Sequence, residues 1–187
     1  QSDKIAHNFG VGKEFNLVPF KGIYWSINKY APFNIQTNVY PVPDLNMPFL
    51  GIHFTPTFND EFPVSIGPTA NLALGRENYY DLQNIEPLSA ASNLLCLLNQ
   101  YVKNEGGFRK YVHQQSLLFL KPLMLREARK LIPSIQSSDL KLSKKVGIRP
   151  QLFNQINKRL ENDFMSLRGE NSTHIMNAIS PAFTASF

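Results

Sequence analysis

The sequence predicts an α+β fold in which a mainly antiparallel or mixed sheet is covered by helices. Two blocks of strand-like segments, before residue 70 and after residue 140, are separated by residues 88–131, where apolar side chains recur at helical spacing. A sheet-helices-sheet order within one chain is typical of this fold class. The 187 residues, without internal repeats or low-complexity segments, are expected to form a single domain, residues 1–187.

The first block is expected to begin with a short helix at Ser2–Asn8 and to continue as strands. The strands are expected at Phe15–Val18, Gly22–Ile27, Phe49–Thr55 and Phe62–Ile66. Pro19 should separate the first two, because proline cannot donate a ladder hydrogen bond. The pair Asn59-Asp60 favours a hairpin turn between the last two.

The middle block is expected to hold three helices. The first, Leu88–Val102, has apolar residues that should share one face, namely Ala91, Leu94, Leu97, Leu98 and Tyr101. Gly106-Gly107 should end this first helix. The second helix is expected at Phe108–Leu120, and the third helix should run from Pro122 to before Pro133.

Strands are expected to return in the last block, and to join the first block in one continuous sheet. They are predicted at Val146–Leu152, Phe164–Leu167 and His174–Met176.

The composition excludes several classes of protein. Lys and Arg outnumber Asp and Glu by 19 to 14, but the cations are scattered and no basic tract is interleaved with aromatic residues, so nucleic acid is not the expected partner. An anionic small molecule fits this charge.

A single cysteine, Cys96, excludes an internal disulfide and favours a reducing compartment. Cys96 is expected to be a buried structural thiol. Neither a signal peptide nor a membrane-spanning stretch is found, and the start at Gln1 favours a fragment or processed product.

An ordered series of motifs resembles one family of flavoproteins. The motifs are Lys21–Trp25, Tyr40–Asp44, Pro48–Pro56, Gly67–Leu74, Gly147–Gln151, Asp163-Phe164 and Asn177–Ser186. Together they resemble the L-2-hydroxyglutarate dehydrogenase/oxidase family, which belongs to the D-amino-acid-oxidase-like enzymes. The resemblance implies the substrate-binding portion of an FAD-dependent oxidoreductase, which oxidises a 2-hydroxy acid to a 2-oxo acid by hydride transfer to flavin. The alternative is a non-catalytic binding or interaction module that keeps the fold without the cofactor.

The resemblance covers only the C-terminal half of such an enzyme. Gly10 and Gly12 follow no buried strand and lack the third glycine of a dinucleotide-binding motif, so the N-terminal Rossmann-like FAD domain is expected to be absent. The isolated chain should therefore bind FAD weakly or not at all. Residues 177–187 would start the C-terminal helix that contacts the flavin. The expected location is the cytoplasm, with the surface of the inner membrane as an alternative.

Two residues are the candidates for catalysis. Arg149 lies between Gly147 and Pro150 in a strand, and its planar guanidinium matches a carboxylate; the resemblance gives this arginine the role of substrate anchor. His53 lies in an apolar strand, where alternation places it opposite Ile52 and Phe54, and an imidazole can accept the proton of a hydroxyl group. A structural ion pair for Arg149 and a hydrogen-bonded core position for His53 are the alternatives.

The remaining candidates concern the cofactor and the cavity wall. Ser180-Pro181 has the pattern of a helix start, whose N–H groups could stabilise the negative charge of a reduced flavin. The proposed cofactor contacts are Ser180, Pro181, Ala182, Phe183 and Thr184. Tyr40 and Thr69 are candidate substrate contacts, and Tyr24 and Trp25 are candidate aromatic walls. The four histidines have no metal-ligand spacing, so no metal is expected.

Overall fold

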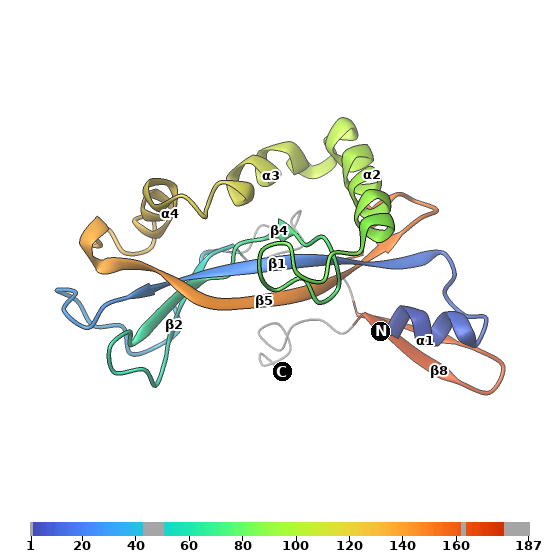
Figure 1. Ribbon diagram of the computed structural model, residues 1–187, viewed down its shortest axis with the longest axis horizontal. Helices are drawn as coiled ribbons and strands as arrows, with labels where there is room; N and C mark the ends of the chain where they lie inside the picture. Colours follow the sequence, from blue (N-terminus) through green and yellow to red (C-terminus); the bar gives the residue numbers. More distant parts are fainter. Residues whose placement is uncertain (1, 43–50, 162–163, 178–187) are drawn as a thin grey trace.

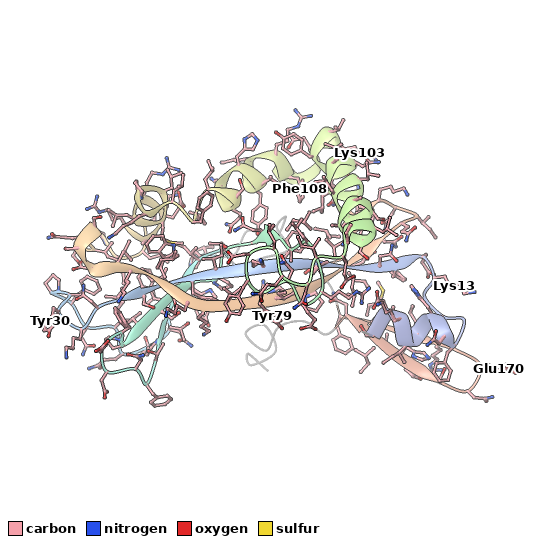
Figure 2. All side chains as sticks on the ribbon, in the orientation of Figure 1. Lys13, Tyr30, Tyr79, Lys103, Phe108 and Glu170 are labelled. Carbon is pink, nitrogen blue, oxygen red and sulfur yellow. The ribbon has the colours of Figure 1, made fainter. Side chains whose placement is uncertain are left out.

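The computed structural model describes residues 2–42, 51–161 and 164–177. Two long strands, β1 (Phe15–Ile27) and β5 (Leu140–Asn154), pair along their whole length and form the axis of the molecule. Three helices lie in a row along one side of this ladder, as Figure 1 shows. Tyr30 lies at one end of the long axis, and Lys13 and Glu170 lie at the other (Figure 2).

The described elements alternate as the sequence predicts, in an α+β arrangement. The helices are α1 (Ser2–Asn8), α2 (Pro87–Lys103), α3 (Phe108–Ser116) and α4 (Lys121–Ala128), with 3₁₀ turns η1 (Glu105–Gly107) and η2 (Ser137–Asp139). The shorter strands are β2 (His53–Pro56), β3 (Val64–Gly67), β4 (Asn71–Leu72), β6 (Arg159–Leu160), β7 (Met165–Arg168) and β8 (Thr173–Asn177). The second helix of the middle block ends at Ser116, four residues before its expected end.

The expected break at Pro19 is wrong, because β1 runs through it. Pro19 lies directly opposite Pro150 in the ladder, and its carbonyl accepts a hydrogen bond from the Ala73 N–H. In an antiparallel pair, the N–H and C=O of one residue point to the same side. Both polar positions of residue 19 therefore face away from β5, and the missing N–H removes no bond from the ladder.

The expectation of one sheet that includes the strand near Phe164 is also wrong. The main sheet has the order β2-β3-β1-β5-β6, with β4 paired to β1, and every described pairing in it is antiparallel. Strands β7 and β8 form a separate two-stranded sheet. Only the turn 169–172 separates these two strands, so they pair with each other at low entropic cost.

The sheet is covered differently along its length. At the α4 end, a cluster of buried side chains from β1, β2 and β3 packs on Met124 and Ala128. Near α2 and α3, a smaller cluster includes Phe108 and Tyr111. On α2 the expected apolar face is only partly correct: Leu97 and Tyr101 pack on the sheet. The remaining members of that face are exposed, namely Ala91, Leu94 and Leu98.

A third cluster joins the two ends of the described chain. Ala6 of α1 packs with Met176 of β8 against β1 and β5. Beside it, the buried carboxylate of Asp3 accepts two hydrogen bonds from the Arg76 guanidinium, at 2.7 and 2.5 Å. The loop before α2 is thus fastened to α1.

Candidate functional site

A cavity of about 290 Å³ opens over the middle of the β1–β5 ladder. Its walls come from β1, from β5 and from the loop after β3, and they include Phe20, Gly22, Tyr24, Thr69, Gly147 and Arg149. Two pairs in this set are register partners: Phe20 lies opposite Arg149, and Gly22 lies opposite Gly147. Directly paired residues place their side chains on the same face of a sheet. The cavity therefore lies on one face of the sheet. The paired glycines Gly22 and Gly147 leave space there, and Arg149 brings a guanidinium to the wall.

Glycine at position 22 lets the loop after β3 lie against the ladder. A Cβ added to Gly22 would lie 2.6 Å from the Cβ of Pro68, closer than two carbon atoms can approach. The loop is then fixed by Thr69, whose N–H donates to the Ile23 carbonyl at 3.0 Å and whose hydroxyl accepts from the Ile23 N–H at 3.1 Å. Thr69 is buried and also lines the cavity, so it both holds the loop and forms the wall.

Arg149 is half-buried at this cavity, in the middle of β5. Its positive charge is close enough to Tyr24 and His53 to lower the pKa of both side chains. For Tyr24, burial raises the pKa by more than Arg149 lowers it, so this phenol stays protonated at neutral pH. Arg149 pairs with Phe20, which lies four residues before Tyr24 on β1, so strand alternation puts Arg149 on the face that Tyr24 and His53 share.

His53 lies on the same face, on β2, which is three strands from β5 in the sheet order, and it is not one of the residues that line the cavity. Ile52 and Phe54 are buried in the core, whereas His53 is partly exposed, in agreement with the predicted alternation. His53 pairs with Gly67 across β2 and β3, and a Cβ added to Gly67 would lie 3.0 Å from the Tyr24 ring. His53, Gly67 and Tyr24 therefore form a row across three strands, and the absence of a side chain at Gly67 makes room for the Tyr24 ring.

The environment of His53 favours a neutral imidazole. Burial lowers its pKa below the ordinary 6.5, and the charges of Arg149 and Lys145 lower it further, against the opposing hydrogen bond with Gly51. The Nδ1 atom lies 3.3 Å from the Gly51 carbonyl, which can only accept, so Nδ1 carries the proton in this contact. Nε2 then keeps its lone pair, as a proton acceptor requires.

Tyr40 lies at the rim of this row. Its ring centroid is 4.7 Å from that of His53, and the side chain is 41% exposed. Trp25, by contrast, is a core residue: its indole N–H donates to the Leu118 carbonyl at 3.2 Å on the other face. Of the two expected aromatic walls, Tyr24 lines the cavity and Trp25 does not.

The expected cofactor contacts Ser180, Pro181, Ala182, Phe183 and Thr184 lie outside the described residues, as does Asp163. Of the expected C-terminal helix 177–187, only Asn177 is described, and it ends strand β8.

Three other histidines and Cys96 lie away from the cavity. His174 bonds to the Ser172 hydroxyl at 2.8 Å, and His113 is exposed and bonds to Tyr101. His7 is half-buried, and its Nε2 atom contacts the Gly12 and Phe15 carbonyls. Cys96 is partly buried and its pKa is raised by burial, which suits a structural thiol. Within residues 2–42, 51–161 and 164–177, no three ligand side chains are grouped as a metal site, and no helix could cross a membrane.

Sequence reasoning missed Lys145 as a neighbour of this site. Its Nζ lies 4.5 Å from the Tyr24 ring centroid. In the sequence it forms one half of a basic pair with Lys144, which is typical of a solvated surface. The position of Lys145 depends on a register shift in β5, for which the sequence offers no signal.

Comparison with known proteins shows one consistent likeness. The chain is 34% identical to L-2-hydroxyglutarate dehydrogenase of Indibacter alkaliphilus, over 99% of this chain and 45% of that protein. It is 32% identical to the mitochondrial L-2-hydroxyglutarate dehydrogenase of Caenorhabditis elegans (100% and 43%) and 30% identical to that of Homo sapiens (99% and 40%). No protein-family model matches the chain. The chain is thus related over its whole length to the L-2-hydroxyglutarate dehydrogenases, and it spans less than half the length of these relatives.

Proposed function

We propose that this chain is the substrate-binding portion of an FAD-dependent oxidoreductase that converts L-2-hydroxyglutarate, or a close 2-hydroxy acid, into the 2-oxo acid. The observation that carries the proposal is the single face that holds Arg149 and a neutral His53 beside an open cavity. The likeness to L-2-hydroxyglutarate dehydrogenases supports the substrate class.

Arg149 binds the carboxylate next to the reacting carbon. A guanidinium donates two parallel N–H bonds to a carboxylate, which fixes orientation as well as position. The strand position of Arg149, opposite Phe20 in a long ladder, limits the movement of its backbone. A substrate held in this way presents its hydroxyl group in the direction of His53, across the Tyr24 and Gly67 positions.

His53 accepts the hydroxyl proton at Nε2. As the O–H bond breaks, the electron pair forms the second bond of the carbonyl, and the hydride leaves the same carbon. FAD, when bound, would supply the acceptor for that hydride. The resulting imidazolium lies near two cations, so it readily returns the proton to water after the product leaves.

The described residues fit a flat ring system over the ladder. A Cβ added to Gly147 would meet only the Tyr24 ring, at 3.9 Å, so the surface beside Arg149 carries no side chain. Such a surface admits a planar group in close contact with the backbone. Gly147 and Tyr24 would form this wall.

The replacement Arg149→Lys tests the carboxylate anchor. It keeps the charge and loses the fork, so kcat/KM for L-2-hydroxyglutarate in the natural protein that contains this sequence should fall by roughly 10- to 150-fold. Exposed Arg126, far along the sequence on α4, provides the matched control Arg126→Lys, which should leave kcat/KM unchanged. An unchanged kcat/KM in Arg149→Lys would contradict the anchor role.

The pH profile tests the proton acceptor. Because the pKa of His53 is lowered from 6.5, the base is deprotonated at neutral pH, and kcat/KM should fall only when the pH drops through that lowered value. His53→Gln should abolish this acidic limb and reduce kcat by about 10²- to 10⁴-fold. A wild-type profile that loses activity well above pH 6.5 would exclude His53 as the base.

A further inference from the structure

The strands β1 and β5 lose their regular register next to the cavity. Ile23 pairs with Val146, and the next ladder pair is Trp25 with Leu142. Three residues of β5, 143–145, therefore face the single residue Tyr24 of β1. The Lys145 N–H donates to the Ser143 hydroxyl at 3.1 Å, which closes this irregular segment on itself. Such bulges re-aim side chains beside functional sites.

The bulge holds the Lys145 ammonium group over the Tyr24 ring, 4.5 Å from its centroid. A cation over an aromatic face is attracted to it, and the contact leaves the three N–H donors available to another ligand. Within the described residues, no carboxylate forms an ion pair with Lys145. Tyr24 is itself a wall of the cavity, so the Lys145 ammonium group lies next to a residue of the wall that also includes Arg149.

We propose that Lys145 binds the distal carboxylate of a 2-hydroxy diacid, so that the cavity selects diacids over monoacids. The proposal rests on the proposed function, in which Arg149 holds the carboxylate next to the hydroxyl. Lys145 is the last residue of the irregular segment, and Arg149 lies four positions further along β5. Four positions on a regular strand span about 13 Å at the α-carbons, a gap that a five-carbon diacid and two long side chains can bridge. Both cations also lie close enough to His53 to lower its pKa.

The first experiment compares ligands that cannot be oxidised. Glutarate has two carboxylates and butyrate has one, and neither carries the hydroxyl group. Their binding to the purified chain is followed by NMR titration for the wild type, Lys145→Met, and the control Lys144→Met, which removes the neighbouring exposed charge. The wild type should prefer glutarate, and Lys145→Met should lower that preference roughly tenfold, as expected for one charged hydrogen bond. Lys144→Met should keep it.

The second experiment measures the kcat/KM ratio of L-2-hydroxyglutarate to L-2-hydroxybutyrate in the natural protein. Lys145→Met should lower this ratio because kcat/KM falls for L-2-hydroxyglutarate and stays the same for L-2-hydroxybutyrate. Lys145→Arg should restore most of the ratio. An equal loss for both acids, or no change in the ratio, would overturn the role of Lys145. If glutarate binding depends on Lys145 while neither hydroxy acid is oxidised, the proposed function fails and the diacid site stands.

If the wild type binds neither glutarate nor L-2-hydroxyglutarate, the diacid site is itself wrong. Thermal melts of Lys145→Met and Lys144→Met should coincide with that of the wild type, because both side chains are exposed. A lower melting temperature for Lys145→Met alone would point to a structural contact with Tyr24, and the Lys145→Arg variant then decides. Arginine also stacks on tyrosine. If Lys145 has only a structural role, Lys145→Arg should therefore restore the melting temperature, and the preference for glutarate should be the same in the wild type, Lys145→Met and Lys145→Arg.

Discussion

The two ends of the β1–β5 ladder are covered by helices of the same sequence block, yet in opposite ways. At the α4 end, Met124 and Ala128 are fully buried on the sheet. On α2 the only buried residue is Asn93, and four of its five leucines are exposed, Leu95 to 67%, whereas Leu97 packs on the sheet. An amphipathic pattern thus indicates that a helix has an apolar face, but it does not say that the same sheet covers that face.

The largest effect is expected at the α4 end. Met124→Ala removes a fully buried side chain from the cluster that joins α4 to β1, β2 and β3. The free energy of unfolding should fall by about 2–5 kcal/mol, from lost burial and from the cavity left behind. Urea denaturation followed by circular dichroism measures it. A loss below about 1 kcal/mol would show that this end collapses around the gap.

A smaller effect is expected where α1 meets the loop before α2. Asp3→Asn removes the charge that receives two hydrogen bonds from Arg76, and the free energy of unfolding should fall by about 1.5–3 kcal/mol at pH 7. The same bonds are reflected in the pKa of Asp3. Burial acts to raise this pKa, but the hydrogen bonds from Arg76 and from the backbone outweigh burial and lower the pKa from 3.8 to about 2.

Because the folded pKa of Asp3 is depressed, its stabilising contribution is present above about 3.8 and is lost as the pH falls towards 2. The difference in unfolding free energy between wild type and Asp3→Asn should therefore be constant from pH 7 to 5 and shrink below pH 4. A difference that grows on acidification would exclude this ion pair as its origin.

The smallest effect is expected on the exposed face of α2. Leu95→Ser should change the free energy of unfolding by no more than about 0.5 kcal/mol, apart from the small helix propensity of serine, because the side chain already faces solvent. A loss comparable to that of Met124→Ala would mean that the leucine face is covered in solution. Sedimentation of the two variants would then distinguish self-association from a fold that differs from this one.

Local patterns in the sequence were sufficient for most elements of the fold. The helix α1 has its expected bounds, and α2 starts at Pro87, one residue before the expected start. The continuity of β1 could not be predicted, because Pro19 is tolerated where its missing N–H faces away from β5, and this depends on the register with a strand far along the chain. The separation of β7 and β8 was missed for a similar reason, since strand patterns do not specify partners.

At the candidate site, the residue type indicated which side chains could act on a substrate, but the sequence did not indicate where the fold would place them. Arg149 and His53 stand out because a cation and an imidazole are unusual in apolar strands, and the structure brings them to one face. Lys145 lacks such a signal, because an exposed lysine is ordinary and only the bulge opposite Tyr24 sets its direction. The roles of all three remain predictions for the experiments above.

The pairing of β1 with β5 also has a consequence for biosynthesis. Every pair in this ladder joins residues more than 100 positions apart, such as Phe15 with Asn154. At a synthesis rate of about 5–20 residues per second, the apolar residues of β1 wait on the order of ten seconds before β5 leaves the ribosome. Contacts of such long range are also slow to form. During that interval the nascent chain exposes one half of its central ladder, so chaperone supply should limit its yield more than the stability of the finished fold does.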